Sequence, residues 1–207
     1  MVVTEAKSPA EILQAIEEKG VKRLAVVGCG SCATIAGTGG KDQVKAMKAY
    51  LSEKGLEVLA ANTLETACHE RLATRLVRQL PEKVQAVVVL ACGSGVQNVA
   101  DVFDGSVIAG LNTLFVGKTK RPGVFLKYCL QCGNCVLNET AGICPKTRCP
   151  KGILNGPCGG MFKGRCEVHP ENECIWVKIC SKVSRENAKT IRWADYSKMN
   201  LRAEESR

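Results

Sequence analysis

Cysteine placement constrains this chain more than any other feature. Its 207 residues include thirteen cysteines, nine of which lie between Cys129 and Cys180. The first twenty residues carry four glutamates and lack the apolar segment of a signal peptide, so we expect a cytoplasmic protein. In that reducing compartment, clustered thiols indicate metal binding rather than disulfides. An isolated cysteine can equally be an ordinary buried residue.

Residues 8–117 alternate between helical and strand patterns. A capping box at Ser8 and Glu11, with Pro9 at the first helical position, predicts a helix that ends at Gly20. Further helices are predicted at 44–51, 69–80 and 96–102, and near-continuous apolar strands at 23–28, 56–60, 84–90 and 113–116. Such strands separated by helices indicate a parallel sheet covered on both faces. We therefore predict a doubly wound α/β domain of about four strands over residues 1–120.

Four cysteines follow the first three predicted strands. They are Cys29, Cys32, Cys68 and Cys92. Because the carboxyl ends of parallel strands meet at one edge of a sheet, we expect these thiols to converge. Four thiolates suit a [4Fe-4S] cluster or a zinc site.

The first loop has a competing interpretation. Gly28 to Ala33 reads GCGSCA, which fits the G-x-G-x-x-G/A loop that holds a dinucleotide pyrophosphate, as in a reductase with its own nucleotide. That fingerprint also needs an acidic residue at the end of the second strand, where Ala60-Ala61-Asn62 stands. We favour the metal site, and small core cysteines under a glycine-rich turn remain the other alternative.

The second half, residues 121–207, loses its periodicity and is predicted to be a cysteine-rich iron–sulfur domain with a charged tail containing Trp193. Cys129, Cys132 and Cys135 form a C-x2-C-x2-C run, which can hold three corners of one cubane. The other predicted ligands are Cys144, Cys149, Cys158, Cys166 and Cys174. The spacing departs from the ferredoxin pattern, and zinc remains the alternative at one of these sites. We expect two or three [4Fe-4S] clusters in the chain.

Two residues of this half are left out of the ligand set. Cys180 is the expected spare thiol, because it ends the apolar segment IWVKIC and packing would explain it. His169 could replace a thiolate, but a solvated turn is the favoured interpretation.

The net charge of +9 is concentrated where the cysteines are densest. Positive charge there can compensate anionic thiolate clusters or attract an acidic electron carrier. A zinc-stabilised basic module that binds nucleic acid is the alternative, although aromatic residues make up only 4% of the chain and form no base-stacking pattern.

Nothing in the sequence indicates a catalytic constellation. The chain has two histidines, no P-loop and no evident Ser/His/Asp or paired-carboxylate set, so no catalytic residue is assigned. No apolar run approaches the roughly 20 residues that a membrane helix needs. The sequence is typical of an electron-transfer protein.

The motifs CLQCGNC, ICPKTRCPKG and LNGPCGG, between Cys129 and Cys180, resemble the methylenetetrahydrofolate reductase C-terminal domain family. The order of the two domains is similar to that of MetV-type small iron–sulfur subunits. This resemblance implies a heteromeric complex, in which a flavin-containing MetF-type partner binds FMN and folate and reduces methylenetetrahydrofolate to methyltetrahydrofolate. The small subunit would then be non-catalytic and would pass electrons to that FMN from a donor such as ferredoxin or another oxidoreductase module.

Overall fold

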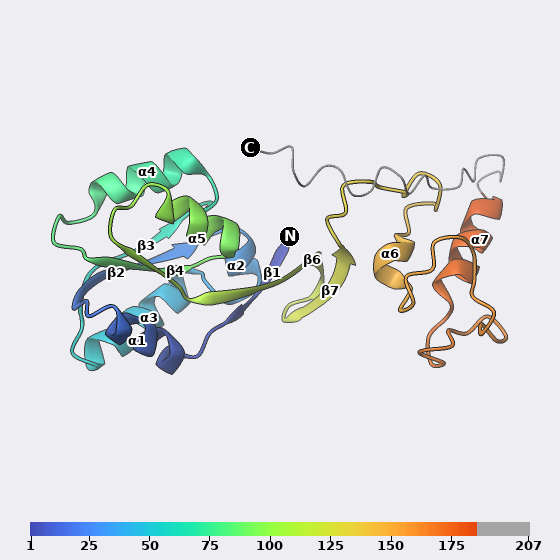
Figure 1. Ribbon diagram of the computed structural model, residues 1–207, viewed down its shortest axis with the longest axis horizontal. Helices are drawn as coiled ribbons and strands as arrows, with labels where there is room; N and C mark the ends of the chain where they lie inside the picture. The colour runs from blue at the N-terminus through green and yellow to red at the C-terminus, as the bar shows by residue number, and fades with distance from the viewer. Residues whose placement is uncertain (186–207) are drawn as a thin grey trace. The chain divides into compact units, whose positions relative to one another are not determined.

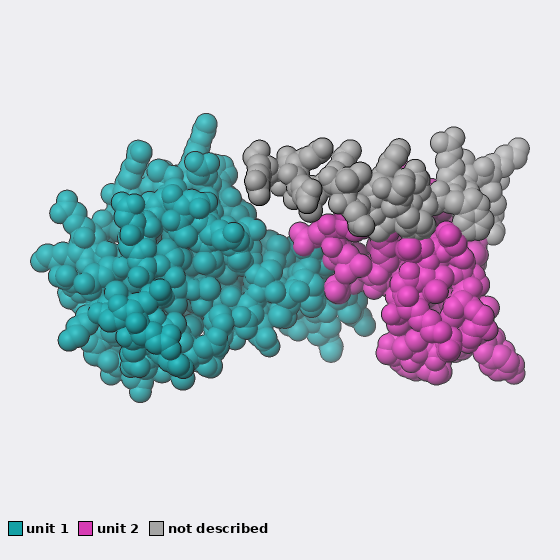
Figure 2. Space-filling view, viewed as in Figure 1, with its two compact units in different colours: residues 1–126 teal, residues 127–207 magenta. Residues whose placement is uncertain are grey.

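The computed structural model describes residues 1–185. The chain divides into two compact units, Met1–Leu126 and Lys127–Arg207 (Figure 2). The division falls after Leu126, a little later than the predicted boundary after residue 120. The tail that contains Trp193 lies outside the described residues.

A four-stranded parallel sheet forms the centre of unit 1 (Figure 1). Its strands are β2 (Arg23–Cys29), β3 (Glu57–Leu64), β4 (Ala86–Leu90) and β5 (Ser106–Ala109), in the order β3-β2-β4-β5. All three neighbouring pairs are parallel, which confirms the predicted parallel sheet. Because the chain leaves β2 toward one side and later returns on its other side, the topological switch point lies between β2 and β4.

Helices cover both faces of this sheet (Figure 1). On one face lie α1 (Pro9–Glu18) and α3 (Lys41–Glu53), and on the other lie α4 (Glu70–Gln79) and α5 (Gly93–Ala100). A single turn, α2 (Cys32–Ile35), follows β2 directly. The fold of unit 1 is therefore a doubly wound α/β layer structure.

The two central strands are buried along their length. Val26, Val87 and Val88 have no exposed surface, as expected for a parallel sheet covered on both faces. Burying one such side chain stabilises the fold by about 1.5–3 kcal/mol. The sheet is consequently a rigid support for the loops that leave its carboxyl edge.

The predicted fourth parallel strand at 113–116 is wrong. Those residues belong to β6 (Leu111–Arg121), which pairs antiparallel with β1 (Val2–Ala6) in a separate sheet of order β1-β6-β7. The true fourth strand, β5, has only four residues and gives a weak pattern. Thr113 and Leu114 are exposed, so this segment is half-solvated, in the manner of antiparallel strands. The last strand of the second sheet is β7 (Val124–Cys129).

Unit 2 has little regular structure among its described residues. It contains a single turn, α6 (Pro145–Arg148), and one longer helix, α7 (Ile175–Arg185). Its buried apolar cluster is small and consists of Cys174, Ile175, Trp176 and Ile179. The Trp176 indole Nε1 donates a hydrogen bond to the Ile153 carbonyl at 2.8 Å. A core of this size is less than a domain normally needs, and other linkages usually compensate.

No helix among residues 1–185 has the length and hydropathy needed to cross a membrane.

Glycines let the loop after β2 pack against its neighbours without side chains between them. A Cβ atom on Gly39 would lie 2.0 Å from the Leu90 carbonyl oxygen at the end of β4. One on Gly28 would lie 2.4 Å from the Gly39 carbonyl oxygen. Both distances are shorter than any allowed contact, so these positions need glycine for backbone approach.

We predict that Gly39→Ala lowers the free energy of unfolding by about 1–3 kcal/mol, because the added methyl overpacks a rigid backbone contact. Gly93→Ala is the control: its Cβ would lie 3.6 Å from Thr113 Oγ1, an ordinary contact, and alanine favours the helix there. Urea unfolding of both variants tests this. Equal losses in the two variants would contradict it.

Candidate metal centres

The structure brings the first four cysteines to the carboxyl edge of the parallel sheet. Cys29 is the last residue of β2, and Cys32 opens α2. Cys68 lies between β3 and α4, and Cys92 caps α5 directly after β4. Two of these positions, Cys29 and Cys92, flank the topological switch point, where open α/β sheets bind ligands.

These thiols lie within electrostatic reach of one another. The pKa of Cys68 is raised, first by partial burial and then by the neighbouring Cys92, with further contributions from Cys29 and Cys32. A thiolate at one position thus disfavours ionisation at the others. Cys29 is buried and Cys68 is exposed, so the set extends from the core to the surface.

Three contacts tie the cysteine-bearing loops together. The Gly30 N–H donates to the Leu64 carbonyl at 2.7 Å, which joins the loop after β2 to the end of β3. The Asn98 side chain on α5 donates to the Ala67 carbonyl at 2.7 Å, beside Cys68. A Cβ on Gly95 would lie 2.9 Å from the Ala67 Cβ, so α5 approaches this loop closely.

The same contacts weigh against a pyrophosphate site. The N–H groups of Cys29 and Gly30 already donate to the Gly39 carbonyl at 2.9 Å and the Leu64 carbonyl at 2.7 Å. A phosphate-binding loop would direct such N–H groups toward its ligand. They are engaged within the protein, and the two glycines of the motif serve packing.

The second parallel strand ends later than the sequence predicts. The predicted strand end at 60–62 was wrong, because β3 continues to Leu64 and is followed by Glu65. Asn62 and Thr63 still pair with β2, since edge strands accept polar residues. An acidic residue therefore does follow the second parallel strand. The evidence against a pyrophosphate site is that the N–H groups of Cys29 and Gly30 are already bonded within the protein.

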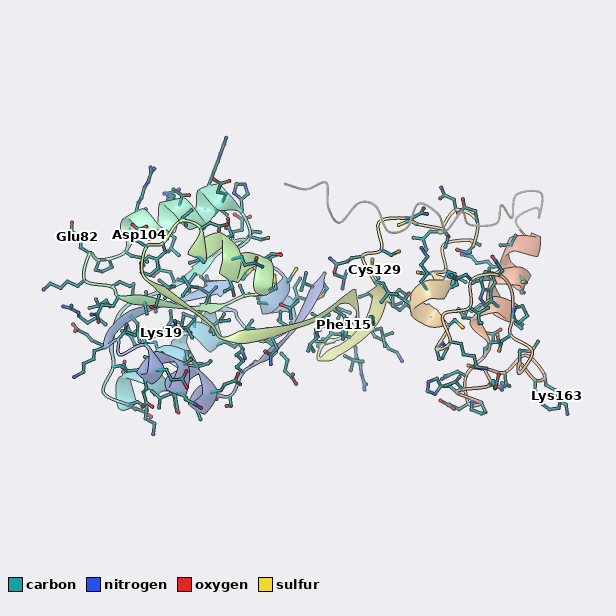
Figure 3. The ribbon with its side chains drawn as sticks, in the orientation of Figure 1. Lys19, Glu82, Asp104, Phe115, Cys129 and Lys163 are labelled. Atoms are coloured by element: carbon teal, nitrogen blue, oxygen red, sulfur yellow. The ribbon has the colours of Figure 1, made fainter. Side chains whose placement is uncertain are left out.

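The CLQCGNC loop begins at Cys129, the last residue of β7 (Figure 3). Gln131 and Gly133 both have left-handed backbone conformations, with φ of 56° and 71°. The Gln131 N–H donates to the Cys129 Sγ at 3.3 Å. Such N–H···S bonds stabilise thiolates and help to set the potentials of iron–sulfur clusters.

Lys146 supports a second thiol of this loop. Its Nζ donates to the Cys132 Sγ at 3.3 Å and to the Asn134 carbonyl at 2.9 Å. Burial raises the pKa of Cys132, but hydrogen bonds at Asn134 and from Lys146 outweigh it, and the pKa is lowered overall. The site thus favours the thiolate, which is the form that binds metals.

Cys158 and Cys166 share a neighbourhood with an exposed ion pair. The Glu167 carboxylate accepts hydrogen bonds from Lys151 and, at 3.5 Å, from the Cys158 Sγ. The Lys151 hydrogen bond lowers the pKa of Glu167, and the Lys151 ammonium also interacts with both thiols. Gly160 of the NGPCGG motif leaves room for the Glu167 side chain.

The remaining cysteines of unit 2 differ in exposure. Cys144 and Cys149 flank α6, and Cys149 packs on the apolar cluster that contains Cys174. Cys180 is exposed on α7, so the packing explanation for it is wrong: the helix turns Ile179 inward instead. His169 is exposed, and its Nδ1 lies 3.6 Å from the Glu171 Oε1. This agrees with the interpretation of residue 169 as part of a solvated turn.

No disulfide joins any of the thirteen cysteines, all of which lie in the described part of the chain. Within residues 1–185, no three His, Cys, Asp or Glu side chains form a group that could hold a metal ion as they stand. The twelve ligand assignments therefore stay predictions. Lys146 and Glu167 form hydrogen bonds with thiols, and Lys151 interacts with two thiols through its charge. The density of basic residues was the sole sequence signal for these partners.

These features define a two-unit protein, with a doubly wound α/β unit followed by a cysteine-rich unit. The family described as methylene-tetrahydrofolate reductase C terminal matches residues 108–200, just under half of the chain. This match supports the family resemblance and associates the cysteine-rich part with methylenetetrahydrofolate reductase. The comparison with curated proteins found no match.

We predict that Asn98→Ala lowers the free energy of unfolding by about 1–3 kcal/mol, because it leaves the part-buried Ala67 carbonyl without its donor. Gln97→Ala is the matched control on the same helix, since its amide donates only to the Gly93 carbonyl one turn earlier. Hydrogen exchange of residues 66–69 should accelerate in the first variant alone. Unchanged exchange there would contradict the role of Asn98 in holding the Cys68 loop.

Proposed function

We propose that this chain is the electron-transfer iron–sulfur subunit of a methylenetetrahydrofolate reductase complex. A flavin-containing MetF-type partner would bind the FMN and reduce methylenetetrahydrofolate to methyltetrahydrofolate, and this chain would supply its electrons. The observation that carries the proposal is the family match over residues 108–200, which spans the CLQCGNC, ICPKTRCPKG and LNGPCGG motifs.

The donor chemistry of both units supports the proposal. The first set consists of four thiols at or near the sheet edge, and all-thiolate ligation suits iron–sulfur clusters or zinc. In the second set, a backbone N–H and a lysine ammonium already point at sulfur. Cys29, Cys32, Cys68 and Cys92 would hold one [4Fe-4S] cluster, and Cys129, Cys132, Cys135, Cys144, Cys149, Cys158, Cys166 and Cys174 would hold the others or a zinc ion.

Bound clusters would supply one-electron redox chemistry between the donor and the flavin. The chain itself would position the thiolates, bury Cys29 away from water and place positive charge beside Cys132 and Cys158. Positive charge and N–H donors favour the more negative, reduced state of a cluster.

Iron and acid-labile sulfide analysis of anaerobically purified chain, with EPR spectra of the reduced protein, tests the proposal. We expect eight to twelve irons per chain, taking about four irons for each cubane. A colourless preparation that contains zinc alone would overturn it and favour the basic interaction or nucleic-acid-binding module. Bound flavin or nucleotide released on denaturation would instead indicate a free-standing reductase.

We predict that Cys29→Ser and Cys92→Ser each lower the iron content by about four atoms per chain, the content of one cubane. Cys180→Ser is the control, because this exposed residue is outside the proposed ligand set. Iron should be unchanged in that variant. If all three variants retained their iron, the first set would be core packing.

We also predict that Lys146→Met lowers the midpoint potential of one cluster, because the reduced state loses a positive hydrogen-bond donor. A tenfold loss in the preference for the reduced state corresponds to about 59 mV for one electron. Lys127→Met is the control: Lys127 is exposed on β7, near Cys129 in sequence. EPR-monitored redox titration measures both, and equal shifts would show a general charge effect instead.

A further inference from the structure

Helix α4 carries an outward row of arginines. Arg71, Arg75 and Arg78 are spaced by one helical turn and are exposed, so they share one face of the helix. The opposite face holds Ala73 and Leu76 in the core, which fixes the direction of the row. Within residues 1–185, none of the three guanidinium groups has an ion-pair partner.

An open hollow of about 470 Å³ lies among the outward side chains of α4. Its lining residues are Glu70, Arg71, Thr74, Arg75, Arg78 and Gln79. Glu70 is the one carboxylate among them, so the lining is net positive. The Thr74 hydroxyl donates to the Glu70 carbonyl at 3.0 Å, which leaves the three arginines and the Gln79 amide as side-chain donors available to a ligand.

The use of arginine indicates a ligand that offers carboxylates or phosphates, and an acidic protein offers the first. Three of the five arginines of unit 1 lie in this row; the other two are Arg23 and Arg121. Arginine binds carboxylates through two parallel hydrogen bonds, whereas lysine acts as a point charge.

The row also starts beside the first cysteine set. Helix α4 begins at Glu70, and Cys68, which precedes it by two residues, is exposed. A molecule bound along the arginines would therefore lie near the exposed Cys68 at the carboxyl edge of the sheet.

We propose that Arg71, Arg75 and Arg78 form the docking surface for an acidic electron-carrier protein, which donates at the Cys68 side of the sheet edge. In the transfer, the reduced centre of the carrier would lose one electron and a cluster held by the first set would gain it, with no bond made or broken. This inference rests on the proposed function, because it assumes a redox centre at Cys29, Cys32, Cys68 and Cys92.

The chain contains its own matched control for this surface. On α3, which covers the other face of the sheet, Lys41, Lys45 and Lys48 have the same spacing and are also exposed. R71Q/R75Q/R78Q and K41Q/K45Q/K48Q remove the same number of positive charges and insert the same helix-forming residue. Thermal unfolding followed by circular dichroism should show both folded.

Binding of the full chain to a reduced acidic bacterial ferredoxin, measured anaerobically by calorimetry at low salt, tests the proposal. We expect the α4 variant to raise Kd about tenfold or more and the α3 variant less than about twofold, since charge complementarity acts locally. Binding of the unmodified chain should collapse near 1 M salt, where the screening length falls to about 3 Å.

The docking surface would be overturned if ferredoxin binding weakened equally in both variants, or if it weakened in neither. It would also be overturned if the α4 variant lost binding to duplex DNA but kept binding to ferredoxin. Iron and sulfide are measured on each preparation to separate the two proposals. Iron-free chain that still loses ferredoxin binding in the α4 variant overturns the proposed function and supports the docking surface. Iron-loaded chain with unchanged binding overturns the docking surface alone.

Discussion

Parallel pairing of β2 with both of its neighbours is the constraint on which unit 1 depends. It buries Val26 and Val87 completely and places the ends of β2, β3 and β4 at one edge. Every cysteine of the first set lies at that edge or within a few residues after it. The placing of the four cysteines at this edge is thus a consequence of strand order.

Backbone contact refines what strand order begins. Gly39 lets the loop after β2 rest on the end of β4, and Gly95 lets α5 approach the loop that carries Cys68. The N–H groups of Cys29 and Gly30, which a nucleotide-binding loop would turn toward a phosphate, are likewise bonded to neighbouring carbonyls. The same residues that make the sequence look like a dinucleotide fingerprint therefore serve to close the loops on one another.

Unit 2 follows a different principle. Its described core is a small cluster around Trp176, and its order depends on turns, left-handed residues and polar contacts to sulfur. Lysine ammonium groups beside Cys132 and near Cys158 make the local positive charge part of the thiol environment. The basic character of this segment has a structural use close to the cysteines, apart from any nucleic acid.

The sequence by itself determined the parallel α/β architecture and the placing of Cys29, Cys68 and Cys92 after strands, because apolar runs and helical periodicity are local signals. The sequence could not separate β5 from β6. Strand β5 has only four residues with a weak pattern, whereas the apolar segment at 113–116 lies in the longer strand β6, which belongs to the other sheet. Tertiary structure alone decided the partners of Cys132 and the exposure of Cys180. It also decided the outward row of Arg71, Arg75 and Arg78, because such contacts depend on which face of each element the rest of the chain covers.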